Sequence, residues 1–380
     1  MRELRLIADD LTGALDSGCA FADPDQPVLV GLPRRPLPQA SRLAVSTETR
    51  NLPEEQAALI VAGMVRRLAP STPAGALWFK KIDSVMRGHP VAETKAAFHA
   101  GDFQRCVFAP AFPGMGRITI DGRQHTIDPG GNAPAAVGPS FAEAFRSQGL
   151  CAQIVAFDER GQPRAGATGK VLVIDAESQD MLRQRISAMP ARLDGKTLWV
   201  GSGGLAATLA GAGPVISHPP IRGLIVGTRH PVTRDQVERI LAAGLAVDAA
   251  EHAAAPGNGR PLLMAPSLSA SSAIDAERRL RASIPHIDIP EPRETSFLVT
   301  GGGTLSILLE AVAADFLECH GQVVTGVPVS RVRGGRWNGV TILSKSGGFG
   351  AGDLMLKLLR ACSGTPRGAP NASAPRPHAP

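Results

Sequence analysis

Short runs of apolar residues alternate with longer segments of helical spacing along almost the whole chain. The apolar runs have the length of single strands and predict strands at residues 4–8, 43–46, 76–79, 106–109, 153–157, 171–174, 198–200, 224–226, 262–265, 297–300 and 340–343. In the intervening segments, apolar residues recur every three to four positions, which predicts helices at residues 54–68, 178–189, 233–243, 272–283 and 305–318. Strands that are apolar throughout are typical of parallel sheets covered by helices on both faces. The pattern therefore predicts an α/β fold.

The chain of 380 residues is too long for one compact core and suits two domains. A segment with several prolines and glycines, residues 211–222, separates two series of strands and helices and marks the boundary. We expect an N-terminal domain at residues 1–215 and a C-terminal domain at residues 222–362. Each is expected to be a mostly parallel sheet flanked by helices, with a cleft between the two. Residues 363–380 have no apolar periodicity, which predicts a disordered tail.

Composition and charge argue against several classes of protein. Hydrophobic residues make up 43% and charged residues 19%, as in an ordinary globular chain. The formal net charge of +6 is not concentrated in any block, and there is no tyrosine to stack on bases, so we expect no nucleic-acid partner. No apolar run approaches the roughly 18–20 residues of a membrane helix, and the N-terminus does not resemble a signal peptide. We therefore expect a cytoplasmic protein with no membrane partner.

The positions of cysteine and histidine argue against disulfide frameworks and zinc sites. The five cysteines are scattered and never form a Cys-x-x-Cys pair, and the nine histidines form no His-x-x-x-His pair. The odd number and the scatter of the cysteines argue against a disulfide framework, and the lack of a Cys/His ligand cluster argues against structural zinc. We therefore expect neither, and we assign no metal-ligating residue. We interpret the cysteines as small buried side chains in a reducing compartment: Cys19, Cys106, Cys151, Cys319 and Cys362.

Charged and hydroxyl-bearing residues follow the first three predicted strands. The carboxyl ends of parallel strands meet at one edge of a sheet, so we expect these residues to converge there. Carboxylates can hold a polyol hydroxyl or take its proton, and arginine or lysine can bind a substrate carboxylate or phosphate. The alternative is that Asp9 or Thr12 only caps the following helix and that Lys80 and Lys81 are solvated. The candidate residues are Asp9, Asp10, Arg50, Lys81, Asp83, Ser84 and Arg87.

Glycine-rich or polar loops follow three predicted strands of the second half. A glycine turn that leads into a helix presents free backbone N–H groups and the positive end of the helix dipole, which suit a phosphate. One such turn is more often a plain tight turn, but three in one domain favour a nucleotide. The residues therefore indicate phosphoryl transfer from a nucleotide to a small hydroxylated anion. The candidate nucleotide-binding residues are Thr228, His230, Gly301, Gly302, Gly303, Thr304, Gly347 and Gly348.

Six sequence segments resemble the four-carbon acid sugar kinase family, in its threonate and erythronate kinase-like branch. They lie between residues 7 and 354 and are IADDLTGALDSGCAFA, STETR, FKKIDSVMRGHP, FAPAFPGMGRITIDGR, VGTRHPVTRDQ and LSKSGGFGAGDL. The resemblance implies an ATP-dependent kinase that phosphorylates the terminal 4-hydroxyl of a four-carbon sugar acid such as D-threonate or D-erythronate. It also implies a substrate domain followed by a nucleotide domain, with ATP and Mg²⁺ as cofactors.

The resemblance also assigns individual residues. It places at the substrate Asp9, Arg50, Lys81, Asp83 and Ser84. It places at ATP the loop around Thr228 and His230, the turn of residues 301–304, and Gly347. In the resulting kinase hypothesis, Asp83 or Asp10 orients or deprotonates the terminal hydroxyl. Arg50 and Lys81 hold the carboxylate, and Arg87 helps to neutralise the transferring phosphoryl group.

The chain departs from the family pattern in the nucleotide half. The family usually has an acid at the position of Gly303, a serine at that of His230 and a glutamate at that of Gln322. Two alternatives therefore stay open beside the tetronate kinase. One is a 3-oxo-tetronate 4-kinase, and the other is a non-catalytic sensor that binds sugar acid and nucleotide. The sequence does not determine the oligomeric state and is compatible with a homodimer.

Overall fold

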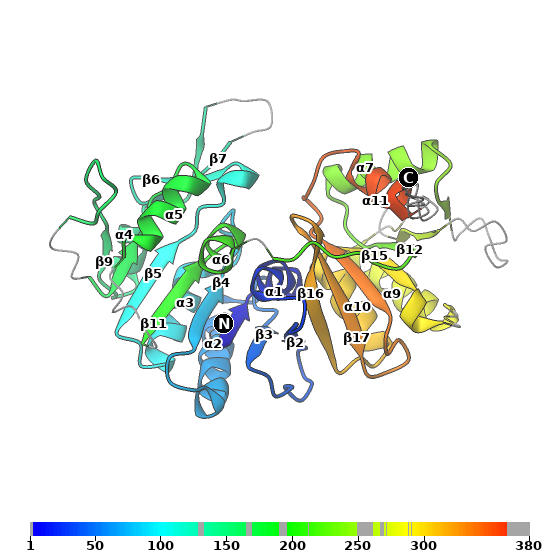
Figure 1. Cartoon of the computed structure of the whole chain (residues 1–380), viewed down its shortest axis with the longest axis horizontal. Coiled ribbons are helices and arrows are strands. Elements are labelled where there is room, and N and C mark those ends of the chain that lie inside the picture. The colour runs from blue at the N-terminus through cyan, green and yellow to red at the C-terminus, as the bar shows by residue number, and fades with distance from the viewer. Residues whose placement is uncertain are drawn as a thin grey trace, which may run out of the picture.

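The computed structural model of the chain describes residues 3–127, 133–164, 169–189, 196–211, 213–248, 261–266, 270, 272–287, 289 and 291–362. Its strands and helices form two halves that lie side by side (Figure 1). The N-terminal half ends with helix α6 (Gly203–Ala210), and the C-terminal half begins with strand β12 (Ile221–Val226). The predicted tail, residues 363–380, lies outside the described residues.

The strands that the N-terminal half contributes to the main sheet are all parallel. They are β1 (Leu4–Ala8), β2 (Val28–Gly31), β3 (Arg42–Ser46), β4 (Leu77–Lys81), β5 (Arg105–Ala109), β9 (Ala152–Ile154), β10 (Val171–Val173) and β11 (Thr197–Gly201). Their order across the sheet is β2, β3, β1, β4, β11, β5, β10 and β9, with parallel pairing throughout. The central strands β1 and β3 are buried along their whole length, as the continuous apolar runs predict.

Helices cover both faces of this sheet. Helix α6 shares its face with α1 (Leu11–Gly18) and α5 (Gln179–Ser187), whose apolar residues join one core cluster. The opposite face carries α2 (Glu54–Leu68), α3 (Pro90–Ala100) and α4 (Phe141–Ser147), which pack into a second cluster. This two-sided covering is the α/β arrangement that the sequence predicts.

The C-terminal half repeats this plan with an antiparallel addition. Its other strands are β13 (Val247–Asp248), β14 (Leu262–Met264), β15 (Ser296–Thr300), β16 (Phe316–Val324), β17 (Val327–Arg333) and β18 (Thr341–Lys345). The order β13, β14, β12, β15, β18 is parallel, and β17 and β16 follow it in antiparallel pairing. Its helices are α7 (Pro231–Ala242), α9 (Ala273–Ser283), α10 (Gly302–Ala311) and α11 (Leu354–Cys362).

The two halves share one continuous sheet. Strand β16 of the C-terminal half pairs antiparallel with β2 of the N-terminal half, which joins all fifteen strands of the main sheet in the described residues. One core cluster extends across this joint from α1 to α10. The sequence predicts two sheets with a cleft between them, and it does not predict β2 or β16. Both halves are mostly parallel sheets flanked by helices, but a strand pair connects them.

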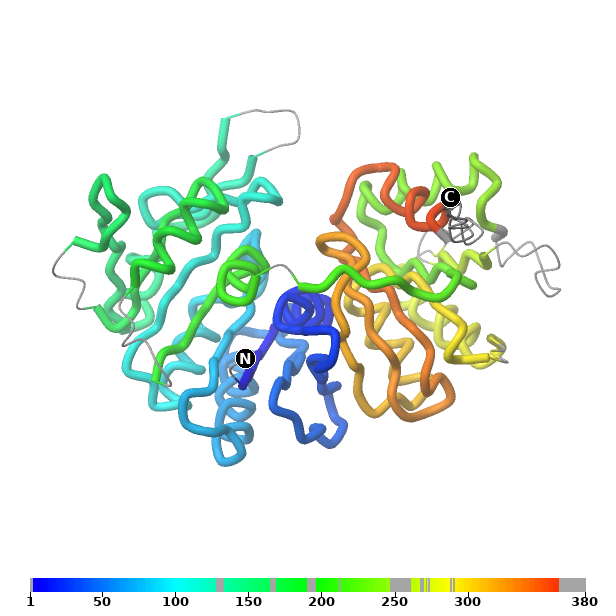
Figure 2. Tube along the Cα trace, in the orientation of Figure 1, coloured from blue at the N-terminus to red at the C-terminus, as the bar shows by residue number. Residues whose placement is uncertain are grey.

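The segment between the halves is packed on the joint. Figure 2 shows the chain passing from α6 to β12 across the boundary of the two halves. The amide of Ile216 donates a hydrogen bond to the carbonyl of Gln322, and the amide of Gln322 donates to the carbonyl of Pro214. A Cβ built on Gly213 would clash with the backbone of Cys19. Residues 213–216 therefore lie against both halves. The close approach to Cys19 needs a glycine at position 213, because it has no Cβ.

One predicted helix ends earlier than its apolar spacing indicates. The spacing predicts a helix at residues 305–318, but α10 ends at Ala311 and β16 begins at Phe316. Ala313 has a φ of +58°, a left-handed conformation that ends a helix. Phe316 and Leu317 continue the helical spacing by coincidence, so the pattern alone misassigns them.

A small antiparallel sheet lies beside the N-terminal half. It consists of β6 (Arg117–Ile120), β7 (Arg123–Thr126) and β8 (Ala135–Val137), in that order. Asp121 and Gly122 both have positive φ, which gives the tight turn between β6 and β7. Short 3-10 helices complete the described elements: η1 (Cys19–Phe21), η2 (Ala69–Ser71), η3 (Pro113–Met115), η4 (Ile284–His286) and η5 (Pro292–Glu294).

Candidate functional site

The three polar loops of the N-terminal half converge at one edge of the sheet. Strands β3, β1 and β4 are adjacent and parallel, so their carboxyl ends place the three loops next to one another. Glu48 and Met86, in the loops after β3 and β4, adopt left-handed backbone conformations with φ of +52° and +62°. Non-glycine residues in this conformation are uncommon and cluster at functional sites.

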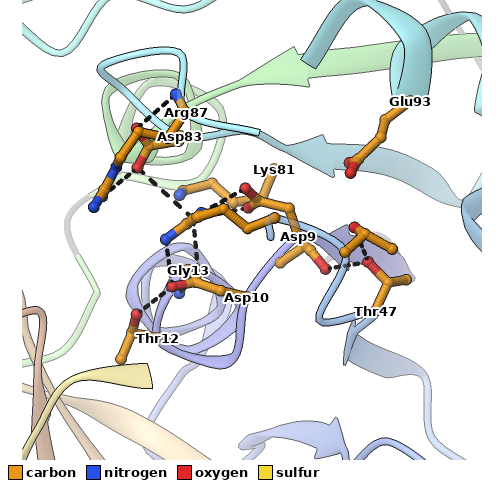
Figure 3. A network of polar contacts seen from close by, with 12 residues as sticks. Asp9, Asp10, Thr12, Gly13, Thr47, Lys81, Asp83, Arg87 and Glu93 are labelled. Atoms are coloured by element: carbon orange, nitrogen blue, oxygen red, sulfur yellow. Dashed lines mark hydrogen bonds and ion pairs between the residues drawn. The ribbon is translucent and has the colours of Figure 1, made fainter. Parts of the chain in front are cut away.

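Arg50 pairs with the carboxylates of Asp9 and Asp10, which are labelled in the polar network of Figure 3. Its Nε donates to Asp9 Oδ2 at 2.8 Å and its Nη2 donates to Asp9 Oδ1 at 2.9 Å. Its Nη1 and Nη2 also donate to the two carboxylate oxygens of Asp10, at 2.6 and 2.8 Å. Asp83 Oδ1 lies 3.7 Å from Nη2. The sequence predicts Arg50 as a clamp on the substrate carboxylate, but in the structure most of its donors are taken by Asp9 and Asp10.

Asp83 holds the loop that follows β4. Its carboxylate accepts hydrogen bonds from the side chain of Arg87, at 3.0 Å from Nε and 2.7 Å from Nη2, and from the amides of Val85 and Arg87. Burial alone would raise the pKa of Asp83, but the hydrogen bonds from Arg87 and the charge of Arg50 outweigh it and lower this pKa to about 2. For Asp9, too, burial is outweighed by Arg50, and its pKa is lowered. Both carboxylates are therefore ionised at neutral pH.

The two consecutive lysines of β4 lie on opposite faces of the sheet and differ in their partners. Lys80 forms a buried ion pair with Glu93 of α3, with Nζ and Oε2 2.7 Å apart. Lys81 is buried on the face that carries the network, and among the described residues its ammonium has no hydrogen-bond or ion-pair partner. The expectation that both lysines are solvated is therefore wrong. Lys81 is the cation in this network that is available to an anionic ligand.

A pocket of about 630 Å³, open to solvent, connects this network to the C-terminal half. The charged wall of the pocket consists of Asp10, Arg50, Lys81, Asp83 and Arg87, and Ser84 lies beside it. The opposite side is formed by residues of the C-terminal half: Gly326, Pro328, Ser344, Ser346 and Phe349. The two halves thus line one pocket together.

Sequence analysis missed several residues that line the pocket. They are Thr12, Gly13, Asp16, Phe112, Met115, Ser202 and Gly203. Asp16 lies three and four residues after Gly13 and Thr12, so helical spacing from these two positions could have identified it. Ser202 and Gly203 follow β11, the neighbour of β4, and lie at the same edge of the sheet. Phe112 and Met115 come from the loop before β6, for which the pattern of strands gives no indication.

The three loops of the C-terminal half also converge. Strands β12, β15 and β18 are adjacent and parallel, and the glycine loops after them are residues 227–230, 301–304 and 346–350. A Cβ built on Gly347 would lie 2.5 Å from Thr228 Oγ1, and one built on Gly348 would lie 3.0 Å from His230 Nε2. The predicted nucleotide-binding residues are therefore brought together, at distances that only glycine allows.

The turn of residues 301–304 brings the glycine loops to the charged wall. Gly301 has a φ of +94° and precedes α10, whose first turn has no side-chain cap. A Cβ on Gly302 would lie 3.2 Å from Asp10 Oδ2 and 3.3 Å from Thr12 Oγ1, whereas nothing lies within 4 Å of a Cβ on Gly303. The uncapped amides of a helix N-terminus attract anions, and here they lie next to the charged wall.

Lys345, at the end of β18, organises the loop of residues 346–350. It is fully buried, and its ammonium donates to the carbonyls of Ser346 and Phe349 at 2.9 and 3.0 Å and to Thr233 Oγ1 at 3.2 Å. No carboxylate among the described residues pairs with it. Burial lowers its pKa to about 8. The sequence motif contains this lysine, but its supporting role depends on tertiary contacts.

The positions at which the chain departs from the family pattern have distinct surroundings. His230 replaces the usual serine, and its Nδ1 accepts a hydrogen bond from the amide of Val232, so it caps α7 as a serine would. Gln322 is buried at the joint between the halves, with its Oε1 3.9 Å from Cys19 Sγ, and does not line the pocket. Gly303 faces open space.

Within the described residues, no helix is long and apolar enough to cross a membrane. No group of three or more His, Cys, Asp or Glu side chains in that part of the chain is arranged to hold a metal ion.

The chain resembles known proteins over most of its length. A family model described as a sugar-binding N-terminal domain matches residues 4–142. A D-threonate kinase of Bordetella bronchiseptica is 31% identical over 404 aligned positions, which cover 94% of this chain and 96% of the relative. A D-erythronate kinase of Heliobacterium modesticaldum is 34% identical over 128 positions, which cover 32% of this chain and 29% of the relative.

A solved structure supports the fold. The crystal structure of a Salmonella typhimurium protein superimposes with a TM-score of 0.71 at 19% identity, covering 95% of this chain and all of the other. At this identity the match supports the architecture alone.

Proposed function

The chain belongs to the four-carbon acid sugar kinase family, and on that premise we propose that it transfers the γ-phosphoryl group of ATP to the terminal hydroxyl of D-threonate. The sugar-acid kinase class follows from the family. The choice of D-threonate over D-erythronate rests on the relative that matches nearly the whole chain, because the D-erythronate kinase matches a third of it.

The observation that carries the proposal is the closeness of two unlike surfaces: the charged wall of the pocket and the turn of residues 301–304, which lies beside the pocket lining. The charged wall offers Lys81, whose ammonium can bind the carboxylate of a sugar acid. The turn offers the uncapped N-terminus of α10, where a Cβ built on Gly302 would lie 3.2 Å from Asp10 Oδ2. A phosphate at this helix end would therefore lie next to a hydroxyl held by the charged wall, as in-line transfer requires.

Each predicted site residue has a role in this proposal. Arg50 fixes Asp9 and Asp10 and adds its charge to the binding of the substrate carboxylate by Lys81. Asp10 and Asp83 accept hydrogen bonds from substrate hydroxyls, and Ser84 contributes a further polar group to the pocket. Arg87, whose side chain is 63% exposed, can turn toward the phosphoryl group and neutralise its charge.

The nucleotide is held mainly by backbone groups. The close contacts of Gly347 with Thr228 and of Gly348 with His230 leave no room for side chains, so a phosphate can approach the backbone there. The turn of residues 301–304 supplies amides and the hydroxyl of Thr304. Mg²⁺ would accompany the phosphates and neutralise part of their charge. Without an acid at Gly303, the chain leaves that ion largely to the phosphates and water.

A screen of ADP formation tests this function. The purified chain is mixed with ATP, Mg²⁺ and each of the four tetronate stereoisomers or their 3-oxo counterparts. We expect the highest kcat/KM with D-threonate. A higher value with a 3-oxo acid would assign the chain to the 3-oxo-tetronate kinases. Tetronate binding by calorimetry without ADP formation would support the sensor instead.

A further inference from the structure

The carboxylates around the pocket differ in how they are held. Asp10 accepts hydrogen bonds from Arg50, from Thr12 Oγ1 at 2.7 Å and from the amide of Gly13 at 2.8 Å. Asp83 is paired with Arg87. Asp16 lines the same pocket, yet among the described residues its carboxylate has no hydrogen-bond or ion-pair partner. It is therefore the pocket carboxylate with its lone pairs available.

The position of Asp16 is fixed from two helices. It lies on the face of α1 that also carries Thr12 and Gly13, since residues three and four apart on a helix are neighbours. A Cβ built on Gly203 would lie 2.9 Å from Asp16 Oδ2 and 2.7 Å from the ring of Phe112. The carboxylate of Asp16 is thus packed against the first turn of α6, beside the ring of Phe112.

We propose that Asp16 accepts the proton of the hydroxyl that is phosphorylated. This inference rests on the proposed kinase function and assigns a catalytic residue to it. The hydroxyl oxygen forms a bond to the γ-phosphorus of ATP, and the bond from that phosphorus to the β–γ bridging oxygen breaks, with its electron pair remaining on ADP. The hydroxyl proton passes to a carboxylate oxygen of Asp16 and is later released to water.

The electrostatic surroundings support Asp16 over the other acids. Burial raises the pKa of Asp16, the charge of Asp10 raises it further, and the charge of Lys81 opposes both. A carboxylate with a raised pKa accepts a proton more readily than one whose pKa arginines have lowered, such as Asp83. The thiol of Cys19, which donates to the backbone carbonyl of Asp16, has a pKa raised by burial and stays neutral.

The test is the substitution Asp16→Asn, which keeps the shape of the side chain and removes its capacity to take a proton. We expect kcat for D-threonate to fall about 10²–10⁴-fold. Calorimetric Kd values for D-threonate and for ATP should stay within about threefold of the parent, because the amide oxygen of asparagine can still accept a hydrogen bond from the substrate hydroxyl. Asp16→Glu should recover part of kcat. Asp180→Asn, an exposed acid on α5, serves as the control with parental kcat.

The pH profile separates proton transfer from a structural role. In the parent, kcat should fall at acidic pH as Asp16 becomes protonated, and this acidic limb should be absent from the residual activity of Asp16→Asn. A variant that is folded by circular dichroism and keeps kcat within about threefold of the parent would overturn the assignment. So would a parallel loss of kcat and tetronate binding, or an unchanged acidic limb. A parent that forms no ADP with any four-carbon acid would instead overturn the proposed function.

Discussion

The charged wall and the glycine loops of the C-terminal half are built by different physical means. The charged wall consists of long side chains that hold one another in place through ion pairs, with Arg50 contacting two carboxylates at 2.6–2.9 Å. The glycine loops are built by close approach of the backbone to neighbouring side chains, which the absence of Cβ atoms at Gly302, Gly347 and Gly348 permits. In the proposed function, the charged wall recognises its ligand by charge and the glycine loops recognise theirs by backbone amides.

This difference determines which substitutions should harm each side. A buried charge network fails when one partner is removed, because the remaining charges are left unpaired. A backbone cradle tolerates changes of neighbouring charge, but an added side chain obstructs it. The two surfaces also lie close together, since a Cβ built on Gly302 would lie 3.2 Å from Asp10 Oδ2, so a side chain added at this position should affect both ligands.

The largest effect is expected from Arg50→Ala, which removes the centre of the charged wall. KM for D-threonate should rise by a factor on the order of 10–1000 through the loss of charge-assisted contacts. The free energy of unfolding should fall by about 3 kcal/mol, because Asp9 and Asp10 lose their common partner. KM for ATP should barely change. Steady-state kinetics and urea unfolding measure these values, with the exposed Arg67→Ala as control. An equal rise in KM for D-threonate and for ATP would place Arg50 between the binding sites of the two substrates.

An intermediate effect is expected from side chains added to the turn of residues 301–304. Gly302→Val should raise the calorimetric Kd of ATP about 10–100-fold. It should also weaken the binding of D-threonate, because the Cβ of the valine would displace Asp10 and Thr12. An unchanged Kd for ATP would place the phosphates elsewhere.

Gly303→Asp is the matched variant at the open position of the same turn. With Mg²⁺ present, it should strengthen ATP binding by a few-fold, roughly 1 kcal/mol or less, because the added carboxylate can contact the hydrated ion. With EDTA present it should weaken binding through repulsion of the phosphates. Weakening under both conditions would contradict a magnesium position near residue 303.

The smallest effect concerns the pH dependence of stability at Lys345. Its pKa in the folded chain is about 8, lowered by burial from 10.5, so between these values the unfolded chain binds more protons. The contribution of Lys345 to the free energy of unfolding should therefore rise with pH, by about 1 kcal/mol between pH 7 and pH 9. Lys345→Met should lack this rise in urea unfolding at the two pH values. An identical pH dependence in both proteins would show that the ammonium is not charged and buried.

Much of the candidate site could be predicted because it follows strand ends. Asp10, Arg50, Lys81 and Asp83 follow three adjacent parallel strands, and the topology of such sheets places their carboxyl ends together. The same rule holds for the loops after β12, β15 and β18. The partners of these residues could not be predicted in this way. Arg50 pairs with Asp9 and Asp10, whereas the ammonium of Lys81 has no partner among the described residues. This difference depends on side-chain positions, which the spacing of residues in the sequence does not determine.

The sequence by itself determined the α/β fold, the position of most strands and of half of the α-helices in the described residues, and the two sets of polar and glycine-rich loops. These features depend on hydrophobic periodicity and local turn chemistry, which act over a few residues. Only the tertiary structure decided that β2 and β16 join the halves into one sheet, that Gly302 lies beside Asp10, and that Asp16 lines the pocket. These contacts connect residues far apart in the chain or depend on which face of a helix meets its neighbour. The packing of whole helices and strands determines these contacts, and no local sequence pattern encodes that packing.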